Sequence, residues 1–72
     1  MILQQWEGIV IDIKDTYFSA KLYDLTNGGT YEIAENIPNN KVSIEDIDLF
    51  QINSIFIWTL YENKSEFKFL RI

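Results

Sequence analysis

Three tyrosines and a lysine are the side chains of this sequence whose types and spacing fit a ligand. Tyr17, Lys21 and Tyr23 stand at even spacing in one predicted strand, which places them on one face. Tyr31 follows the next turn and lies across the predicted hairpin from them. Rings beside a cation form a stacking platform for the bases of single-stranded nucleic acid. The alternative is that the rings shield the outside of the sheet, with their hydroxyl groups in water.

Two further cations, Lys68 and Arg71 in the last predicted strand, complete this candidate surface, and Lys64 stands in the preceding loop. A second candidate surface is acidic. It comprises Asp24, Glu32, Glu35, Glu45 and Asp48. A basic partner could dock on such carboxylates, but acidic side chains also occur on protein surfaces for solubility alone. The net charge of −5 disfavours non-specific binding to a phosphate backbone.

Missing residue types narrow the chemistry further. The sequence has no cysteine and no histidine, so it lacks disulfides, thiolates, the commonest metal ligand and the usual proton shuttle near neutral pH. No nucleophile stands beside a base in a known catalytic motif, and no glycine-rich phosphate loop occurs. We therefore expect a protein that is not an enzyme and that uses no cofactor and no metal.

The sequence shows no segment that would place the chain in a membrane. The N-terminal "MILQQW" is too short and too polar for a signal sequence. The longest apolar stretch, residues 55–60, is far shorter than the roughly 20 residues that a membrane-spanning helix needs. We expect a cytoplasmic protein with no membrane partner.

A chain of 72 residues supports one hydrophobic core, so residues 1–72 are expected to form a single domain. Runs of β-branched and aromatic residues separated by turn residues predict five strands. These strands cover residues 3–14, 17–25, 30–37, 54–61 and 67–72, with an Asn-Gly-Gly turn after the second. Gly8 inside the first strand indicates a β-bulge or a close approach of another group to the backbone.

The predicted core consists of large apolar side chains on one face of each strand. Phe18, Ala20 and Leu22 alternate along the second strand and should face inward. Phe56 and Trp58 share one side of the fourth strand and are expected to pack against Phe18, Phe67 or Phe69. The alternative for Trp58 is a binding groove. Trp6 is a candidate lid over one end of the fold or an anchor for another chain, and an exposed apolar edge strand could accept a partner's strand.

One short helix is predicted between the third and fourth strands, over residues 43–51. Ser43 is a good N-cap residue, and Asp46 stands three positions later, where a capping box has its acid. Ile44, Ile47 and either Leu49 or Phe50 would form the inward stripe. Asn53 can adopt the left-handed conformation that ends a helix.

Three strands, a helix and two strands follow the chain order of a small five-stranded OB-like barrel of the S1 type, in which the helix closes one end. An SH3-like barrel is the alternative. The sequence also resembles small uncharacterised bacterial OB/S1-like β-barrel proteins in three blocks. These blocks are Trp6-Glu7-Gly8-Ile9-Val10, Ser43 with Asp46 and Leu49, and Phe56 with Trp58. The sequence departs from them in having the short "ENKSE" loop where they have a long basic hairpin.

These observations favour a non-enzymatic binding module that acts through protein contact, as an acidic accessory protein or by self-association. The runner-up function is single-stranded nucleic-acid binding through the tyrosine face.

Overall fold

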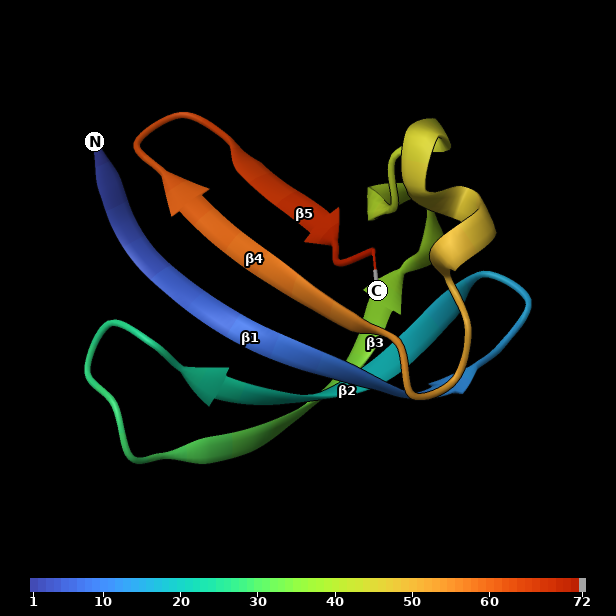
Figure 1. The fold of residues 1–72 in the computed structure, drawn as a ribbon, viewed down its shortest axis with the longest axis horizontal. Coiled ribbons are helices and arrows are strands. Elements are labelled where there is room, and N and C mark those ends of the chain that lie inside the picture. The colour runs from blue at the N-terminus through green and yellow to red at the C-terminus, as the bar shows by residue number, and fades with distance from the viewer. Residues whose placement is uncertain (72) are drawn as a thin grey trace.

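Five antiparallel strands form one sheet in the computed structural model, which describes residues 1–71 (Figure 1). The strands are β1 (Ile2–Ile13), β2 (Tyr17–Asp24), β3 (Tyr31–Pro38), β4 (Ile55–Tyr61) and β5 (Ser65–Phe69). Their order across the sheet is β3-β2-β1-β4-β5, so β1 is central and β3 and β5 are the edge strands. The prediction of a small, mainly β fold is confirmed. Ile72, the last residue of the predicted closing strand, lies outside the described residues.

The turn between β2 and β3 contains the positive φ angles that its glycines predict. Positive φ angles of 73° and 78° fall on Gly28 and Gly29 rather than on Asn27. Glycine adopts this left-handed region without the clash that a Cβ atom would cause. The predicted alternation along β2 is also confirmed, because Phe18, Ala20 and Leu22 are all buried.

A cluster of phenylalanine rings forms the centre of the core. Phe56 and Phe18 are fully buried, with ring centroids 6.1 Å apart in an edge-to-face arrangement. Phe56 also contacts Phe67 and Phe69, at centroid distances of 5.4 and 5.2 Å. Such pairs of large rings bury most of the apolar area in a small domain. The sheet curls around these rings, which hold β2, β4 and β5 together.

Gly8 lets the Phe56 ring lie directly on β1. A Cβ atom at position 8 would collide with the ring of Phe56, so a side chain at this strand position would force the ring to move. The predicted bulge lies elsewhere. The pairing of β1 with β2 shifts register between Val10 and Asp12, and Asn36 in β3 takes a φ of 63° where β3 shifts against β2. These irregularities increase the local bend and twist of a sheet.

The segment between β3 and β4 is helical, as predicted, but its type differs from the expected α-helix. It contains two 3₁₀ helices, η1 (Asn39–Lys41) and η2 (Ile44–Leu49). The Ser43 hydroxyl forms no capping hydrogen bond, and the Asp46 N–H donates to the Ser43 carbonyl oxygen instead. The predicted capping box is therefore wrong, whereas Asn53 does take a positive φ, of 76°.

The predicted inward stripe of this helix is wrong at two positions. Ile44 is 89% exposed and Ile47 is 53% exposed. A 3₁₀ helix has three residues per turn, so residues 44 and 47 lie on the same side, and here that side faces solvent. Leu49 and Phe50 at the end of η2 pack against the core instead.

Contacts to the end of β5 hold η2 in place. A carboxylate oxygen of Asp46 accepts a hydrogen bond from the Phe69 N–H at 3.0 Å. Arg71 donates to the Glu45 carbonyl oxygen at 3.0 Å and lies 3.9 Å from the carboxylates of both Asp46 and Asp48. The helical segment is thus attached to the edge of the sheet beside β5. Among residues 1–71, no helix is long and apolar enough to cross a membrane.

The contact between Gly8 and Phe56 yields a stability prediction. We expect Gly8→Ala to lower the free energy of unfolding by about 1–3 kcal/mol, because the added methyl group overpacks a fully buried ring. Urea denaturation of the wild type and the variant measures this change. A double-mutant cycle with Phe56→Leu is the control, since a smaller side chain should relieve part of the clash. Equal costs of Gly8→Ala in both backgrounds would contradict the assignment.

Candidate binding surfaces

The side of the sheet that faces away from the core carries exposed apolar side chains. Strand pairing places Ile9 of β1 between Lys21 of β2 and Ile55 of β4, and Lys21 beside Ile33 of β3. Ile9 is 37% exposed and Ile33 is 58% exposed. We call this surface the outer face. It comprises Glu7, Ile9, Ile11, Lys21, Tyr23, Tyr31, Ile33, Ile55 and Ile57.

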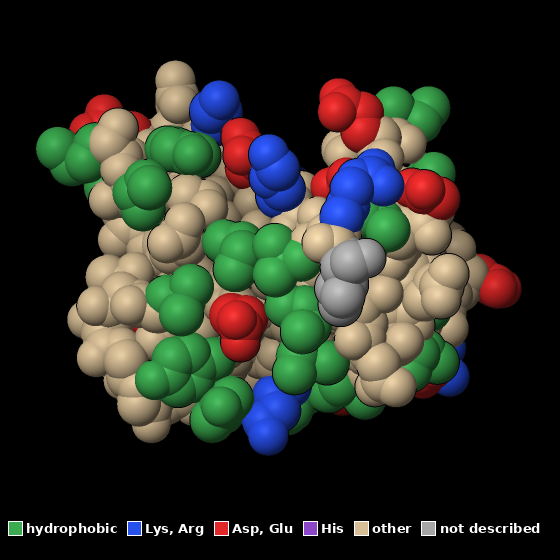
Figure 2. All heavy atoms as spheres, viewed as in Figure 1, with side chains coloured by type: hydrophobic (Ala, Val, Ile, Leu, Met, Phe, Trp, Pro, Cys, Tyr) green, Lys and Arg blue, Asp and Glu red, His purple; other side chains and the backbone are tan. Residues whose placement is uncertain are grey.

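Figure 2 shows hydrophobic side chains gathered in a band across the middle of the molecule, over β1 and β4, on the side where the outside of the sheet is seen. Acidic and basic side chains interrupt the band at single points. The alternation of the strands explains the arrangement. Val10 and Phe56 point into the core, so their neighbours Ile9 and Ile57 must point outward.

Three of the four predicted platform residues lie together on the outer face. Tyr23 and Tyr31 are cross-strand partners whose ring centroids are 4.9 Å apart, at an interplanar angle of 52°. The Lys21 ammonium group lies 4.5 Å from the centroid of the Tyr31 ring, in a cation–π contact. The Tyr23 hydroxyl accepts a hydrogen bond from the Gly29 N–H at 3.0 Å, which fixes this ring beside the turn.

The other predicted platform residues lie apart from this cluster. Tyr17 pairs with Pro38 at the opposite end of β2. Tyr23 lies six positions further along the strand, which corresponds to about 20 Å. Lys68 lies beyond Ile57 on β5, at the far edge of the sheet from Tyr31. Arg71 points to η2, where it lies 3.9 Å from the carboxylates of Asp46 and Asp48.

The predicted acidic residues are distributed over three parts of the fold. Glu32 and Glu35 are exposed on the edge strand β3, and Glu45 and Asp48 are exposed on η2. Asp24 lies at the end of β2. Within the described residues, no group of three or more potential ligands is close enough to hold a metal ion.

The carboxylate of Asp24 serves the β2–β3 turn. It accepts hydrogen bonds from the backbone N–H groups of Thr26 and Asn27, at 2.9 and 3.0 Å. The side-chain amides of Asn27 and Gln4 donate to it as well, at 3.0 and 2.7 Å. These donors, led by the Asn27 backbone N–H, lower the pKa of Asp24 below its ordinary value of 3.8. A structural role thus accounts for this acid.

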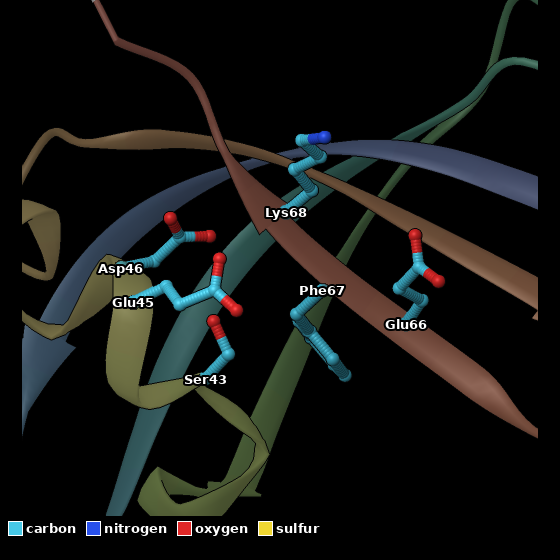
Figure 3. Close-up of a pocket in the computed structure, with 6 residues that line it drawn as sticks. All are labelled: Ser43, Glu45, Asp46, Glu66, Phe67 and Lys68. Atoms are coloured by element: carbon cyan, nitrogen blue, oxygen red, sulfur yellow. The ribbon is translucent and has the colours of Figure 1, made fainter.

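Two hollows flank Phe67 along the edge strand β5, and Figure 3 shows the first of them. The first has a volume of about 300 Å³ and lies between β5 and η2. Its lining residues are Ser43, Glu45, Asp46, Glu66, Phe67 and Lys68. In Figure 3 the Glu45 side chain extends from η2 toward β5, whereas Glu66 and Lys68 project from the side of β5 turned away from η2. We call the two hollows together the edge groove.

The second hollow, of about 280 Å³, lies between β5 and the end of β3. Trp58 and Phe67 form its apolar wall, and their rings are stacked with centroids 4.7 Å apart. The Trp58 indole N–H is buried and has no hydrogen-bond acceptor among residues 1–71. Trp6, the other tryptophan, is partly buried and lies against Trp58, with ring centroids 4.8 Å apart.

The sequence contained only part of the signal for the edge groove. The i and i+2 spacing of Phe56 and Trp58 placed both on the inner side of β4, and both do pack with Phe67. Only the tertiary structure shows that Trp58 also borders an opening. The sequence predicts a capping role for Asp46, and only the structure shows that its carboxylate meets the edge of β5.

Comparison with known proteins adds no relative, since no family model, curated protein or solved structure matches the chain. The outer face and the edge groove are therefore the candidate sites of function.

The lowered pKa of Asp24 leads to a prediction about pH. A carboxyl group whose pKa is lower in the folded state stabilises the fold above its unfolded pKa, and this contribution is lost as the pH falls through the folded pKa. We therefore expect the wild type to lose stability between about pH 5 and pH 2, and Asp24→Asn to lack this component. Unfolding free energies measured across this range test the prediction. The matched control, Asp15→Asn in an exposed turn, should retain the component. A profile of Asp24→Asn that parallels the wild type would contradict it.

Proposed function

We propose that this chain is a non-enzymatic binding module that acts through protein contact, either by self-association or as an acidic accessory protein of a larger partner. The outer face is the observation that carries the proposal. Ile9, Ile11 and Ile33 remain exposed there, although the chain has a well-filled aromatic core. Contiguous exposed apolar patches on small proteins typically mark interaction sites.

The charges on the outer face suit contact with protein. Glu7 and Lys21 are the charged side chains set among its isoleucines, and they have opposite signs. In a symmetric pair of copies, the lysine of one could meet the glutamate of the other. A basic partner would instead be attracted by the excess of acidic groups over the whole chain, with a net charge of −5.

We further propose that the fold is an OB-like barrel of the S1 type. The strand order β3-β2-β1-β4-β5, with helical turns between β3 and β4, supports this topology over the SH3-like alternative. The described sheet is open between β3 and β5, where the edge groove lies. The resemblance to small bacterial OB/S1-like proteins through the Trp6–Val10 block is part of the same proposal. A cytoplasmic location accompanies it.

Substitution of Ile9 tests the role of the outer face. We expect Ile9→Lys to weaken association at least about tenfold, which corresponds to roughly 1.4 kcal/mol, because it places a charge at the centre of the apolar surface. Sedimentation over a range of concentrations measures self-association. Photo-crosslinking in the native cell, followed by capture of the chain, measures contact with another protein.

Ile44→Lys is the matched control, since Ile44 is an exposed isoleucine on η2, away from the outer face. It should behave as the wild type does in both assays. A wild-type protein that stays monomeric at all concentrations and forms no crosslink would exclude the proposal, as would equal effects of the two substitutions.

A second candidate function is the binding of single-stranded nucleic acid. The observation that favours it is the cluster of Lys21, Tyr23 and Tyr31, which presents exposed ring surface beside a cation. The net charge of −5 and the engagement of Arg71 by two carboxylates weigh against it. We therefore rank it below protein contact.

Titration with oligothymidylate at low salt decides this second candidate. If bases stack on the cluster, tyrosine fluorescence falls on binding and the affinity decreases steeply with added salt. Tyr31→Leu should then cost about 1–3 kcal/mol of binding free energy. Tyr17→Leu, at the other end of β2, should cost little. Flat titrations of the wild type would exclude the candidate.

A further inference from the structure

We infer that the edge groove binds an extended basic peptide segment of a partner protein, which adds to β5 as a further strand. The inference rests on the proposed function, because it specifies the kind of partner for a module that acts through protein contact. It assigns this binding to a surface distinct from the outer face, on the free edge of the sheet.

The backbone of β5 supplies the first argument. The Leu70 N–H donates to a carbonyl oxygen of β4 at 2.9 Å, so this residue faces the neighbouring strand. The Phe69 N–H points the opposite way, and the Asp46 carboxylate accepts it at 3.0 Å. Alternate residues of a strand direct their N–H groups to the same side. The N–H and C=O groups of Phe67 therefore point away from β4, into the edge groove.

The contact of Asp46 with β5 indicates what the outward-pointing backbone groups of this strand can bind. Its carboxylate occupies the acceptor position that a carbonyl oxygen of a neighbouring strand would take beside Phe69. This contact blocks one end of the β5 edge, as native proteins commonly do with edge strands. Two residues earlier, at Phe67, hollows lie on both sides. A peptide strand running there could exchange backbone hydrogen bonds with Phe67 in the manner of β-augmentation.

The hollow beside Trp58 supplies the second argument. A strand directs alternate side chains to opposite faces, so a peptide on β5 would place every second side chain toward this hollow. Its volume of about 280 Å³ and its wall of Ala34, Ile37 and Phe67 suit an apolar side chain. The buried Trp58 indole N–H lacks an acceptor among the described residues. An unpaired buried donor destabilises the protein, and a hydrogen bond to a peptide carbonyl oxygen would offset that cost.

The charged residues that line the edge groove indicate which kind of peptide would bind there. The carboxylates that line the edge groove are Glu35, Glu45, Asp46 and Glu66, of which Asp46 already lies 3.9 Å from Arg71, and the cations that line it are Lys41 and Lys68. The side chains of a bound strand that point away from the apolar wall would lie near this acidic lining, so lysine and arginine fit best there. A second copy of this acidic chain fits less well. The occupant is thus a segment in which basic and apolar residues alternate.

NMR spectroscopy of the full ¹⁵N-labelled chain tests the inference with defined probes. The ligand is a capped heptapeptide of alternating lysine and valine. One control peptide replaces lysine with glutamate, and the other carries N-methyl groups on the backbone. We expect the basic peptide to shift the Trp58 indole N–H and Phe67 amide signals, and each control peptide to bind at least about tenfold more weakly.

Matched variants locate the site. Trp58→Phe retains an aromatic ring but removes the indole donor, and it should weaken binding, whereas Trp6→Phe should not. Glu66→Lys reverses a charge at the groove and should weaken binding, whereas Glu62→Lys, in the neighbouring loop, should have little effect. Because Glu66 and Glu62 are both exposed, this second pair tests the inference even if a tryptophan variant fails to fold.

The remaining outcomes would overturn the inference. The first is the absence of any shift at millimolar peptide. The second is an unchanged affinity in both Trp58→Phe and Glu66→Lys. In the third, the shifts appear at Ile9 and Lys21, which would place the peptide on the outer face; the proposed function would then stand without the inference. Sedimentation and crosslinking of the Ile9→Lys variant judge the proposed function separately.

Discussion

The contact between the bare backbone of Gly8 and the ring of Phe56 is the constraint on which the architecture depends. Phe56 is fully buried and touches Phe18, Phe67 and Phe69, so its position determines how β2, β4 and β5 approach one another. Because Gly8 has no side chain, the ring can lie on the central strand and the sheet can curl around it. A small chain without disulfides depends on such aromatic packing for its stability.

Both candidate surfaces follow from this curl. On the outside of the curl, alternation turns Ile9 and Ile57 toward solvent, which creates the outer face. At its two ends, β3 and β5 remain unpaired edges that face each other across the edge groove. The contacts of Asp46 and Arg71 hold η2 beside one end of this opening, so the edge of β5 is covered at Phe69 and borders the edge groove at Phe67. The same aromatic packing thus produces both the outer face and the edge groove.

Local pairing of the cations shapes the electrostatic field of the molecule. Lys14 pairs with Asp12, Lys21 lies over Tyr31, and Arg71 contacts two carboxylates of η2. Exposed pairs of this kind contribute little to stability. These contacts matter for recognition. The acidic side chains outnumber the basic ones, so an approaching molecule meets a negative electrostatic field. This field favours basic protein over nucleic acid as a partner.

The sequence predicted the features that depend on residues close together in the chain, and it missed those that depend on residues far apart in the chain. Alternation at Phe18, Ala20 and Leu22 and the glycine turn after β2 depend on neighbouring residues, and both are confirmed. The hairpin likewise brings Tyr23 and Tyr31 together, since its register follows from the turn. The predicted gathering of Tyr17 and Arg71 with them did not occur, because strand length and a contact with η2 hold both away.

By itself, the sequence determined the strands, their turns and the identity of most core residues, because periodicity and turn chemistry act within a few positions along the chain. Only the tertiary structure decided the 3₁₀ geometry of η2, since the hydrogen bond between Asp46 and Phe69 that accompanies it joins residues 23 positions apart. It also decided the open edge between β3 and β5 and the unpaired indole N–H of Trp58. These features depend on which strands meet across the core, and no local pattern in the sequence encodes that choice.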